Sequence, residues 1–135
     1  MLTTDNLSSI RAIALGLTGM ICLAYAVLSL LYMRPDPMPF WIPGLAGVAA
    51  WLAIMFGTIG AGTKNTERAF DEGYRSDNHR AERAAYWVAL LLYPIFAVPL
   101  IQGWVSFDVA FAAMGTLTGA AYLLPVAWLD YRGRV

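Results

Sequence analysis

Charged residues are scarce in this chain. Asp, Glu, Lys and Arg make up 13% of its 135 residues, whereas 59% of the residues are hydrophobic. A soluble domain usually carries about 25% charged residues, so the shortage indicates a membrane protein. Nine Lys and Arg balance nine Asp and Glu, and this balance gives no reason to expect a nucleic-acid partner.

Cysteine and histidine occur once each, as Cys22 and His79. A single cysteine excludes a disulfide within the chain and a cysteine-based zinc cluster. The carboxylates near His79 follow no spacing typical of metal ligands, and no nucleophile stands beside His79 in a recognisable motif. We therefore expect no metal, no cofactor and no catalytic residue.

The apolar residues form four long runs without Asp, Glu, Lys, Arg or His. A hydrocarbon core about 30 Å thick is crossed by about 20 helical residues, and backbone amides in hydrocarbon must be paired within their own segment. We therefore predict an all-α integral membrane bundle that forms a single domain, residues 1–135. Its four transmembrane helices are expected at residues 12–33, 40–62, 84–102 and 109–129.

The basic residues are unequally distributed around these four runs. With four spans, both termini and the loop at residues 63–83 share one side of the membrane, and only Arg34 lies on the other side. Because basic residues are enriched in cytoplasmic segments, both termini and this loop are predicted to be cytoplasmic. The basic residues on that side are Arg11, Lys64, Arg68, Arg75, Arg80, Arg83, Arg132 and Arg134.

Short connections join the first helix to the second and the third to the fourth, so two antiparallel helical hairpins are predicted. Pro94, Pro99 and Pro125 fall inside the expected helices and should bend them. Helices in lipid approach closely through small residues. Packing within the chain is favoured over a dimer interface at the glycines Gly16, Gly19, Gly57, Gly60, Gly115 and Gly119.

The loop at residues 63–83 is predicted to contain one short helix. Thr66 can cap a helix that begins at Glu67, and Gly73 is expected to weaken or end it. Ser76 or Asp77 offers a second cap, after which a helical extension leads into the third span. The expected break therefore lies between Gly73 and Ser76.

The same loop offers a candidate interaction surface. Phe70 and Tyr74 fall four positions apart on one helical face, where Asp71 and Arg75 can also pair. These rings either dock a partner or lie on the bilayer surface. The residues of the candidate surface are Phe70, Tyr74, Arg75, His79 and Arg80.

The acidic and basic segment ERAFDEG, followed by HRAERAAYW before the third run, resembles small bacterial four-span inner-membrane proteins. The resemblance covers the two-hairpin layout of the whole chain. It implies this architecture and a location in a bacterial inner membrane. These families have no established reaction, so the resemblance implies no activity.

Three functions are compatible with the sequence. We expect a non-enzymatic accessory or regulatory membrane protein, because functional sites within a membrane usually need an ionisable residue and the four runs contain none. The alternatives are a small oligomeric transporter or channel, and a membrane-embedded lipid-modifying enzyme. The expected partners are the lipid bilayer and either another membrane or cytoplasmic protein or further copies of this chain.

Overall fold

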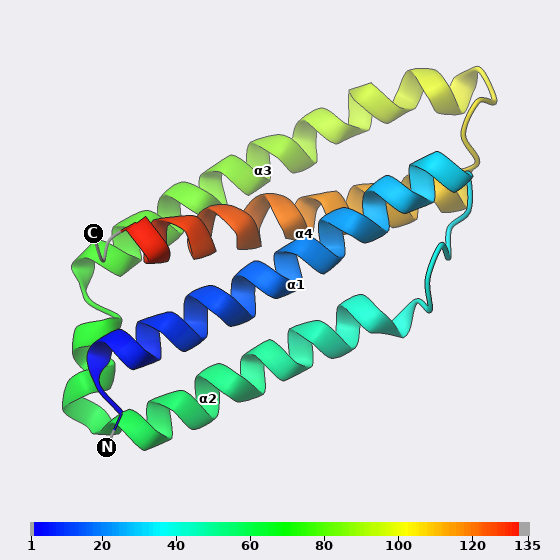
Figure 1. The fold of residues 1–135 in the computed structure, drawn as a ribbon. Coiled ribbons are helices and arrows are strands. Elements are labelled where there is room, and N and C mark those ends of the chain that lie inside the picture. Colours follow the sequence, from blue (N-terminus) through cyan, green and yellow to red (C-terminus); the bar gives the residue numbers. More distant parts are fainter. Residues whose placement is uncertain (1, 133–135) are drawn as a thin grey trace.

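The computed structural model describes residues 2–132, and all regular structure in this range is helical. The helices are α1 (Thr4–Tyr32), α2 (Trp41–Ala69), α3 (Glu72–Ile101) and α4 (Phe107–Arg132) (Figure 1). Each is long and apolar enough to cross a membrane by length and composition. The prediction of an all-α chain with four potential spans is confirmed.

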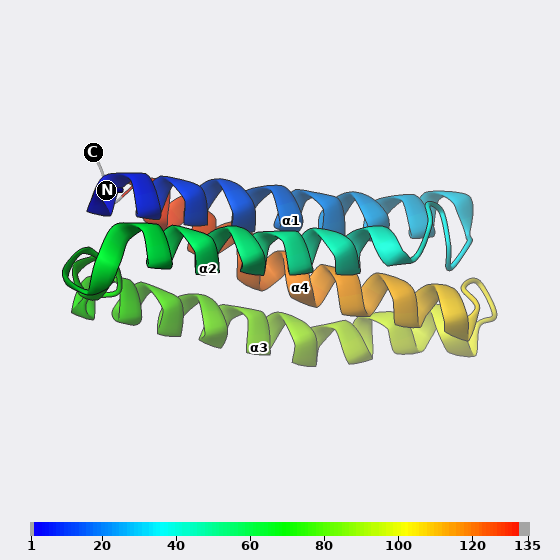
Figure 2. The same ribbon diagram turned by 90° about the horizontal axis from the view of Figure 1, so that it is seen from below.

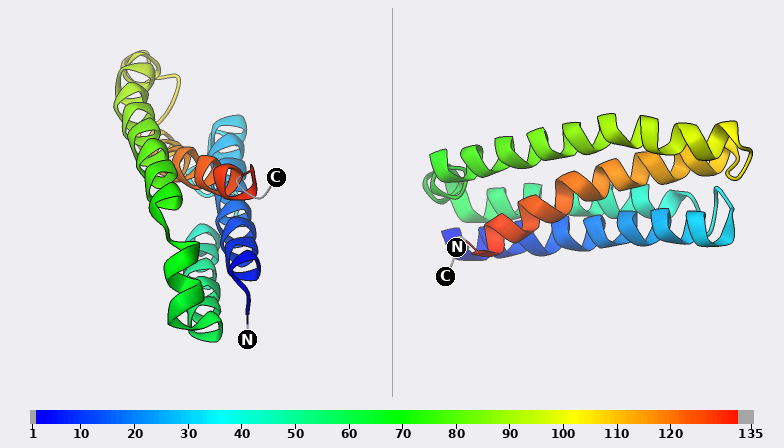
Figure 3. Two further views of the ribbon diagram at one scale, coloured as in Figure 1. Left: turned by 90° about the vertical axis from the view of Figure 1, so that its left-hand side faces the viewer. Right: turned by 90° about the horizontal axis from the view of Figure 1, so that it is seen from above.

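The helices form a curved row and not a closed bundle. α1 packs against α2 on one side and, most extensively, against α4 on the other, and α4 packs against α3. α2 and α3 make little contact, and α4 is visible between them in Figure 2. The order α2–α1–α4–α3 is seen along the helix axes in Figure 3. Consequently α2 and α3 each have one extensively packed helical neighbour.

The start of α1, the end of α2, the start of α3 and the end of α4 meet at one end of the row, here called the polar end (Figure 1). α3 has 30 residues, which extend for about 45 Å at 1.5 Å per residue. A hydrocarbon core is only about 30 Å thick. In a bilayer the excess length would stand outside the hydrocarbon.

Two interruptions at the polar end separate a short helical piece from the rest. The first is Gly62, whose φ of 75° and ψ of 166° interrupt α2 in a region essentially restricted to glycine. The second comprises Phe70 and Asp71, between the end of α2 and the start of α3. We call residues 63–71 the corner segment.

The predicted caps and the predicted break in this segment were wrong. Thr66 is not a cap, because its Oγ1 donates a hydrogen bond to the Thr58 carbonyl at 3.2 Å. Asp71 caps α3 instead, and its Oδ1 accepts from the Tyr74 amide at 3.0 Å. A carboxylate satisfies one of the unpaired amides of the first turn, so α3 begins ahead of Gly73 and continues through the expected break.

Two of the glycines permit especially close helix packing. A Cβ on Gly19 would lie 2.9 Å from the Leu124 side chain, at the contact of α1 with α4. A Cβ on Gly57 would lie 2.9 Å from the Leu7 side chain, at the contact of α2 with α1. At Gly19 the Cγ of Leu124 and the Cβ of Leu123 are also close, at 2.9 and 3.1 Å, so a larger residue would push α1 and α4 apart. At Gly57 the close atom is the terminal methyl of Leu7, which can move aside more easily.

The remaining predicted packing glycines differ in their surroundings. A Cβ on Gly60 would lie 3.1 Å from the Leu2 side chain, whereas Cβ atoms on Gly16 and Gly119 would make ordinary contacts at 3.5 and 3.7 Å. A Cβ on Gly115 would meet nothing within 4 Å. Only Gly119 of the GxxxG pair in α4 therefore approaches a neighbour within the chain.

Candidate functional site at the polar end

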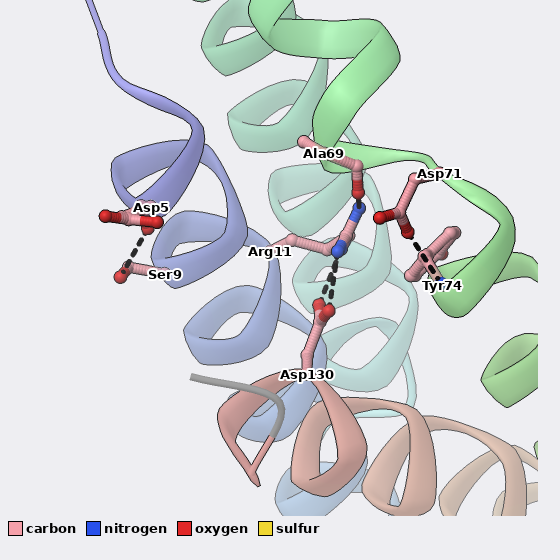
Figure 4. Close-up of polar contacts among 7 residues, drawn as sticks. All are labelled: Asp5, Ser9, Arg11, Ala69, Asp71, Tyr74 and Asp130. Atoms are coloured by element: carbon pink, nitrogen blue, oxygen red, sulfur yellow. Dashed lines mark hydrogen bonds and ion pairs between the residues drawn. The ribbon is translucent and has the colours of Figure 1, made fainter. Parts of the chain in front are cut away.

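Arg11 in α1 is a buried cation that binds Asp130 of α4. Arg11 is 2% exposed. Its Nε and Nη2 donate to the two carboxylate oxygens of Asp130, each at 2.5 Å (Figure 4). The two side chains are 3% and 7% exposed. A bidentate arginine–carboxylate pair is among the strongest charge-assisted hydrogen bonds, so this pair joins α1 firmly to α4.

Arg11 also holds the corner segment. Its Nη1 donates to the Ala69 carbonyl at 2.8 Å. Its Cζ lies 4.6 Å from the centroid of the Phe70 ring and 3.8 Å from that of Tyr74. Each cation–π contact contributes up to about 2 kcal/mol when it is desolvated. One side chain therefore connects α1, α4, the corner segment and the start of α3.

The local sequence explains why Arg11 meets the corner segment. Ala69 is the last residue of α2, and the last carbonyls of a helix have no partner within it, so Arg11 supplies one. Leu7 is fully buried against Ala61 and Ala69. Leu7 lies four positions before Arg11 on the same helical face. Its contacts pack this face of α1 against α2.

A cleft of about 580 Å³ opens beside Arg11. The start of α1, the corner segment, the start of α3 and the end of α4 form its walls. Within residues 2–132 no group of three or more His, Cys, Asp or Glu side chains could hold a metal ion. The charged side chains lining the cleft are Asp5, Arg11, Arg68, Asp71, Asp77 and Asp130.

A second polar network connects α3 to α4. The Tyr122 hydroxyl donates to Asn78 Oδ1 at 2.8 Å, and Asn78 Nδ2 donates to Glu82 Oε1 at 2.7 Å. His79 Nδ1 lies 3.1 Å from Glu82 Oε2. The His79 side chain is 78% exposed. His79 therefore contacts Glu82 at the surface of α3, and the Tyr122–Asn78 hydrogen bond connects α4 to α3.

The residues of the candidate interaction surface fall into two groups. Phe70 and Tyr74 are half-buried and contact Arg11, while Arg75, His79 and Arg80 are exposed. Burial raises the pKa of the Tyr74 hydroxyl, and the Arg11 guanidinium offsets part of this rise. The structure thus brings the two aromatic residues to the buried cation and leaves the three basic residues at the surface.

The predicted pairing of Asp71 with Arg75 does not form in the described chain. The Asp71 carboxylate accepts from the Tyr74 amide instead. A hydrogen bond to a helix N-terminus also places the negative charge at the positive end of the helix dipole. A surface ion pair gives only a few tenths of a kcal/mol. The capping contact therefore stabilises the protein more than the ion pair with Arg75 would.

Arg11 and Asp130 are not among the residues that the sequence singles out. Arg11 directly precedes the first apolar run, and Asp130 directly follows the last. Opposite charges at the same predicted side of two spans are a signal that could have suggested a pair. The sequence alone does not indicate that α1 and α4 are neighbours.

The clefts between the apolar parts of the helices have few polar groups. A cleft of about 460 Å³ lies between α1 and α2, and one of about 560 Å³ lies between α3 and α4. The Thr18 hydroxyl donates to the Ala14 carbonyl at 2.9 Å, and the Thr118 hydroxyl donates to the Met114 carbonyl at 2.8 Å. The Thr18 hydroxyl also reaches the Ala46 carbonyl of α2 at 3.3 Å. Both hydroxyls are therefore engaged by backbone carbonyls, Thr118 within its own helix and Thr18 within and between helices.

The fold and the polar end define a class of protein: an all-α chain with four helices that could cross a membrane and a buried ion pair at one end. A comparison with protein families, curated proteins and solved structures finds no match for this chain.

Proposed function

We propose that this chain is a non-enzymatic accessory or regulatory membrane protein. It acts by packing its outer helix faces against another membrane protein and by presenting the charged polar end on the cytoplasmic side of a bacterial inner membrane. The observation that carries the proposal is the open row of helices. α2 packs extensively only against α1, and its outer face carries Leu45, Val48, Trp51, Phe56 and Ile59, which are 55–69% exposed.

The distribution of charge supports the proposed orientation. The exposed basic residues Lys64, Arg68, Arg75 and Arg80 all lie at the polar end, whereas Arg34 lies at the opposite end. Basic residues are enriched on the cytoplasmic side of membrane proteins. The helix ends that meet at the polar end would therefore face the cytoplasm.

The chemistry of the polar groups favours this function over transport and lipid modification. Thr18 and Thr118, in the clefts between the apolar helices, are bonded to backbone carbonyls: Thr118 to one in α4, and Thr18 to one in α1 and one in α2. A transport path would need polar groups facing the path. His79 is an exposed partner of Glu82, without a nucleophile in the network. The buried charges of Arg11 and Asp130 pair with each other.

Site-specific cross-linking from the native membrane tests the proposal. A photo-reactive residue would replace Trp51 on the outer face of α2, and Ile13 on α1, which is 62% exposed, would be the matched control. After isolation in mild detergent, mass spectrometry would identify cross-linked proteins. The proposal expects one membrane protein, in fixed stoichiometry, that cross-links from position 51 and not from position 13.

The contrary result is equally specific. The accessory function would be overturned if position 51 cross-links only to lipid and the isolated protein forms homo-oligomers that retain a small molecule. That outcome would favour transport or lipid chemistry.

A further inference from the structure

The corner segment has a joint at each of its ends. Gly62 leaves the helical conformation with φ 75° and ψ 166°, and Phe70 and Asp71 separate α2 from α3. The helical piece between these joints, residues 63–69, can change its direction by rotation at few backbone bonds. Hinges in proteins are a few residues of this kind that absorb the backbone change.

The polar contacts that hold the corner segment come from the N-terminal part of the chain and from α2 itself. Thr66 Oγ1 and Asn65 Nδ2 donate to the Thr58 and Ala61 carbonyls, each at 3.2 Å. Arg11 donates to the Ala69 carbonyl at 2.8 Å and stacks on Phe70. Asn65 Nδ2 donates to the Leu2 carbonyl at 3.1 Å. The outer side of the segment, at Lys64 and Arg68, is exposed. Its attachment is therefore one-sided.

Asp130 orients the side chain that makes two of these contacts. Two of the three hydrogen bonds of Arg11 go to Asp130 and the third goes to Ala69. The carboxylate thus fixes the plane of the guanidinium, and this plane determines whether Arg11 reaches both the carbonyl and the Phe70 ring. An event at the end of α4 that displaces Asp130 would release the corner segment.

From these observations we infer that the corner segment is a hinged flap over the polar cleft and that Arg11 is its latch. In the closed state Ala69 and Asp71 line the cleft with Tyr74 and Asp130. In the open state the segment turns about Gly62 and residues 70–71. Opening exposes the rings of Phe70 and Tyr74, which the closed state directs toward Arg11, together with the interior of the cleft.

Hydrogen exchange of the full-length protein in lipid nanodiscs tests the latch. The double variant Arg11→Met with Asp130→Leu removes the latch without leaving an unpaired buried charge. We expect the amides of residues 63–74 to exchange about tenfold faster or more, while residues 14–30 and 110–126 keep their protection. Arg83→Met with Asp108→Leu, which replaces two exposed charges, is the matched control and should leave all amides unchanged.

Two outcomes would overturn the inference. One is unchanged exchange of residues 63–74 in a folded double variant. The other is faster exchange spread evenly over α1 and α4, which would indicate general destabilisation and not a local opening.

A second measurement uses the nearly isosteric single substitution Asp130→Asn, which keeps one oxygen acceptor for Arg11. Spin labels at positions 67 and 83, in a Cys22→Ala background, report the distance from the corner segment to α3. The unsubstituted latch should give one narrow distance distribution, and Asp130→Asn should add a second, longer one. An identical distribution in Asp130→Asn would contradict the role of Asp130 in holding the flap.

Discussion

The geometry around Arg11 explains why an arginine occupies this position. A guanidinium is planar and carries five N–H donors, and three of the contacts at Arg11 use this fork: two to Asp130 and one to Ala69. Its flat face lies against Phe70 and Tyr74. A lysine has a point charge and no planar face, so it could not make these contacts together.

Removing only one member of the pair should destabilise the protein strongly. Asp130→Ala leaves the Arg11 charge buried and uncompensated, which typically costs about 3–5 kcal/mol. Arg11→Met with Asp130→Leu should cost less than Asp130→Ala, because no unpaired charge remains. Chemical unfolding in detergent measures both, and Arg34→Met, at an exposed site, should change the free energy of unfolding by less than about 0.5 kcal/mol. A double variant as unstable as the single one would contradict the pairing.

The backbone of Gly62 gives a second prediction at this scale. Its conformation is essentially restricted to glycine, so Gly62→Ala should destabilise the protein by about 1–3 kcal/mol. Gly47→Ala is the matched control, because a Cβ there meets nothing within 4 Å and alanine favours a helix by up to about 1 kcal/mol. The two variants should shift the unfolding temperature in opposite directions, and a shift of Gly62→Ala in the stabilising direction would refute the assigned hinge conformation.

At the scale of the helices, the contact between α1 and α4 depends on close approach at one glycine. Gly19→Ala should destabilise the protein by about 1–3 kcal/mol, since its Cβ would lie 2.9 Å from the Leu124 side chain. Gly115→Ala in α4 places the same methyl group in open space and should be neutral or slightly stabilising. Thermal unfolding in detergent compares the two, and equal effects would contradict the packing of α1 on α4.

Hydropathy predicted the helices well and their ends poorly, for a physical reason. An apolar run records the part of a helix that suits hydrocarbon, whereas a helix ends where its backbone groups find other partners. α2 therefore ends at Ala69, well beyond residue 62, and α3 begins at Glu72, ahead of the predicted caps at Ser76 or Asp77. α3 begins where it does because the Asp71 carboxylate caps it. The sequence analysis instead expected Gly73 to end the preceding helix.

The buried pair shows a different limit of the sequence. Arg11 and Asp130 are 119 positions apart, and their contact requires α1 and α4 to be neighbours. Short connections predict the pairs α1–α2 and α3–α4, but they do not specify which helices of the two hairpins meet. The three-dimensional arrangement was therefore needed to find the residue that organises the polar end.

For the whole molecule, the row of helices places the two ends of the described chain together and the two short connections at the opposite end (Figure 1). If all four helices cross the membrane, Asp36 and His79 must lie on opposite sides of it. Both side chains are exposed, so a cysteine at either position should react with a maleimide once the reagent has access.

Labelling in intact cells tests this topology and its direction. In a Cys22→Ala background, Asp36→Cys should react with a membrane-impermeant maleimide added outside, whereas His79→Cys should react only after the inner membrane is permeabilised. The expectation rests on the basic residues at the polar end, which favour the cytoplasm. Reaction of position 79 alone from outside would show that the orientation is opposite to the predicted one. Reaction of both positions in intact cells would mean that the helices do not cross the membrane as four spans.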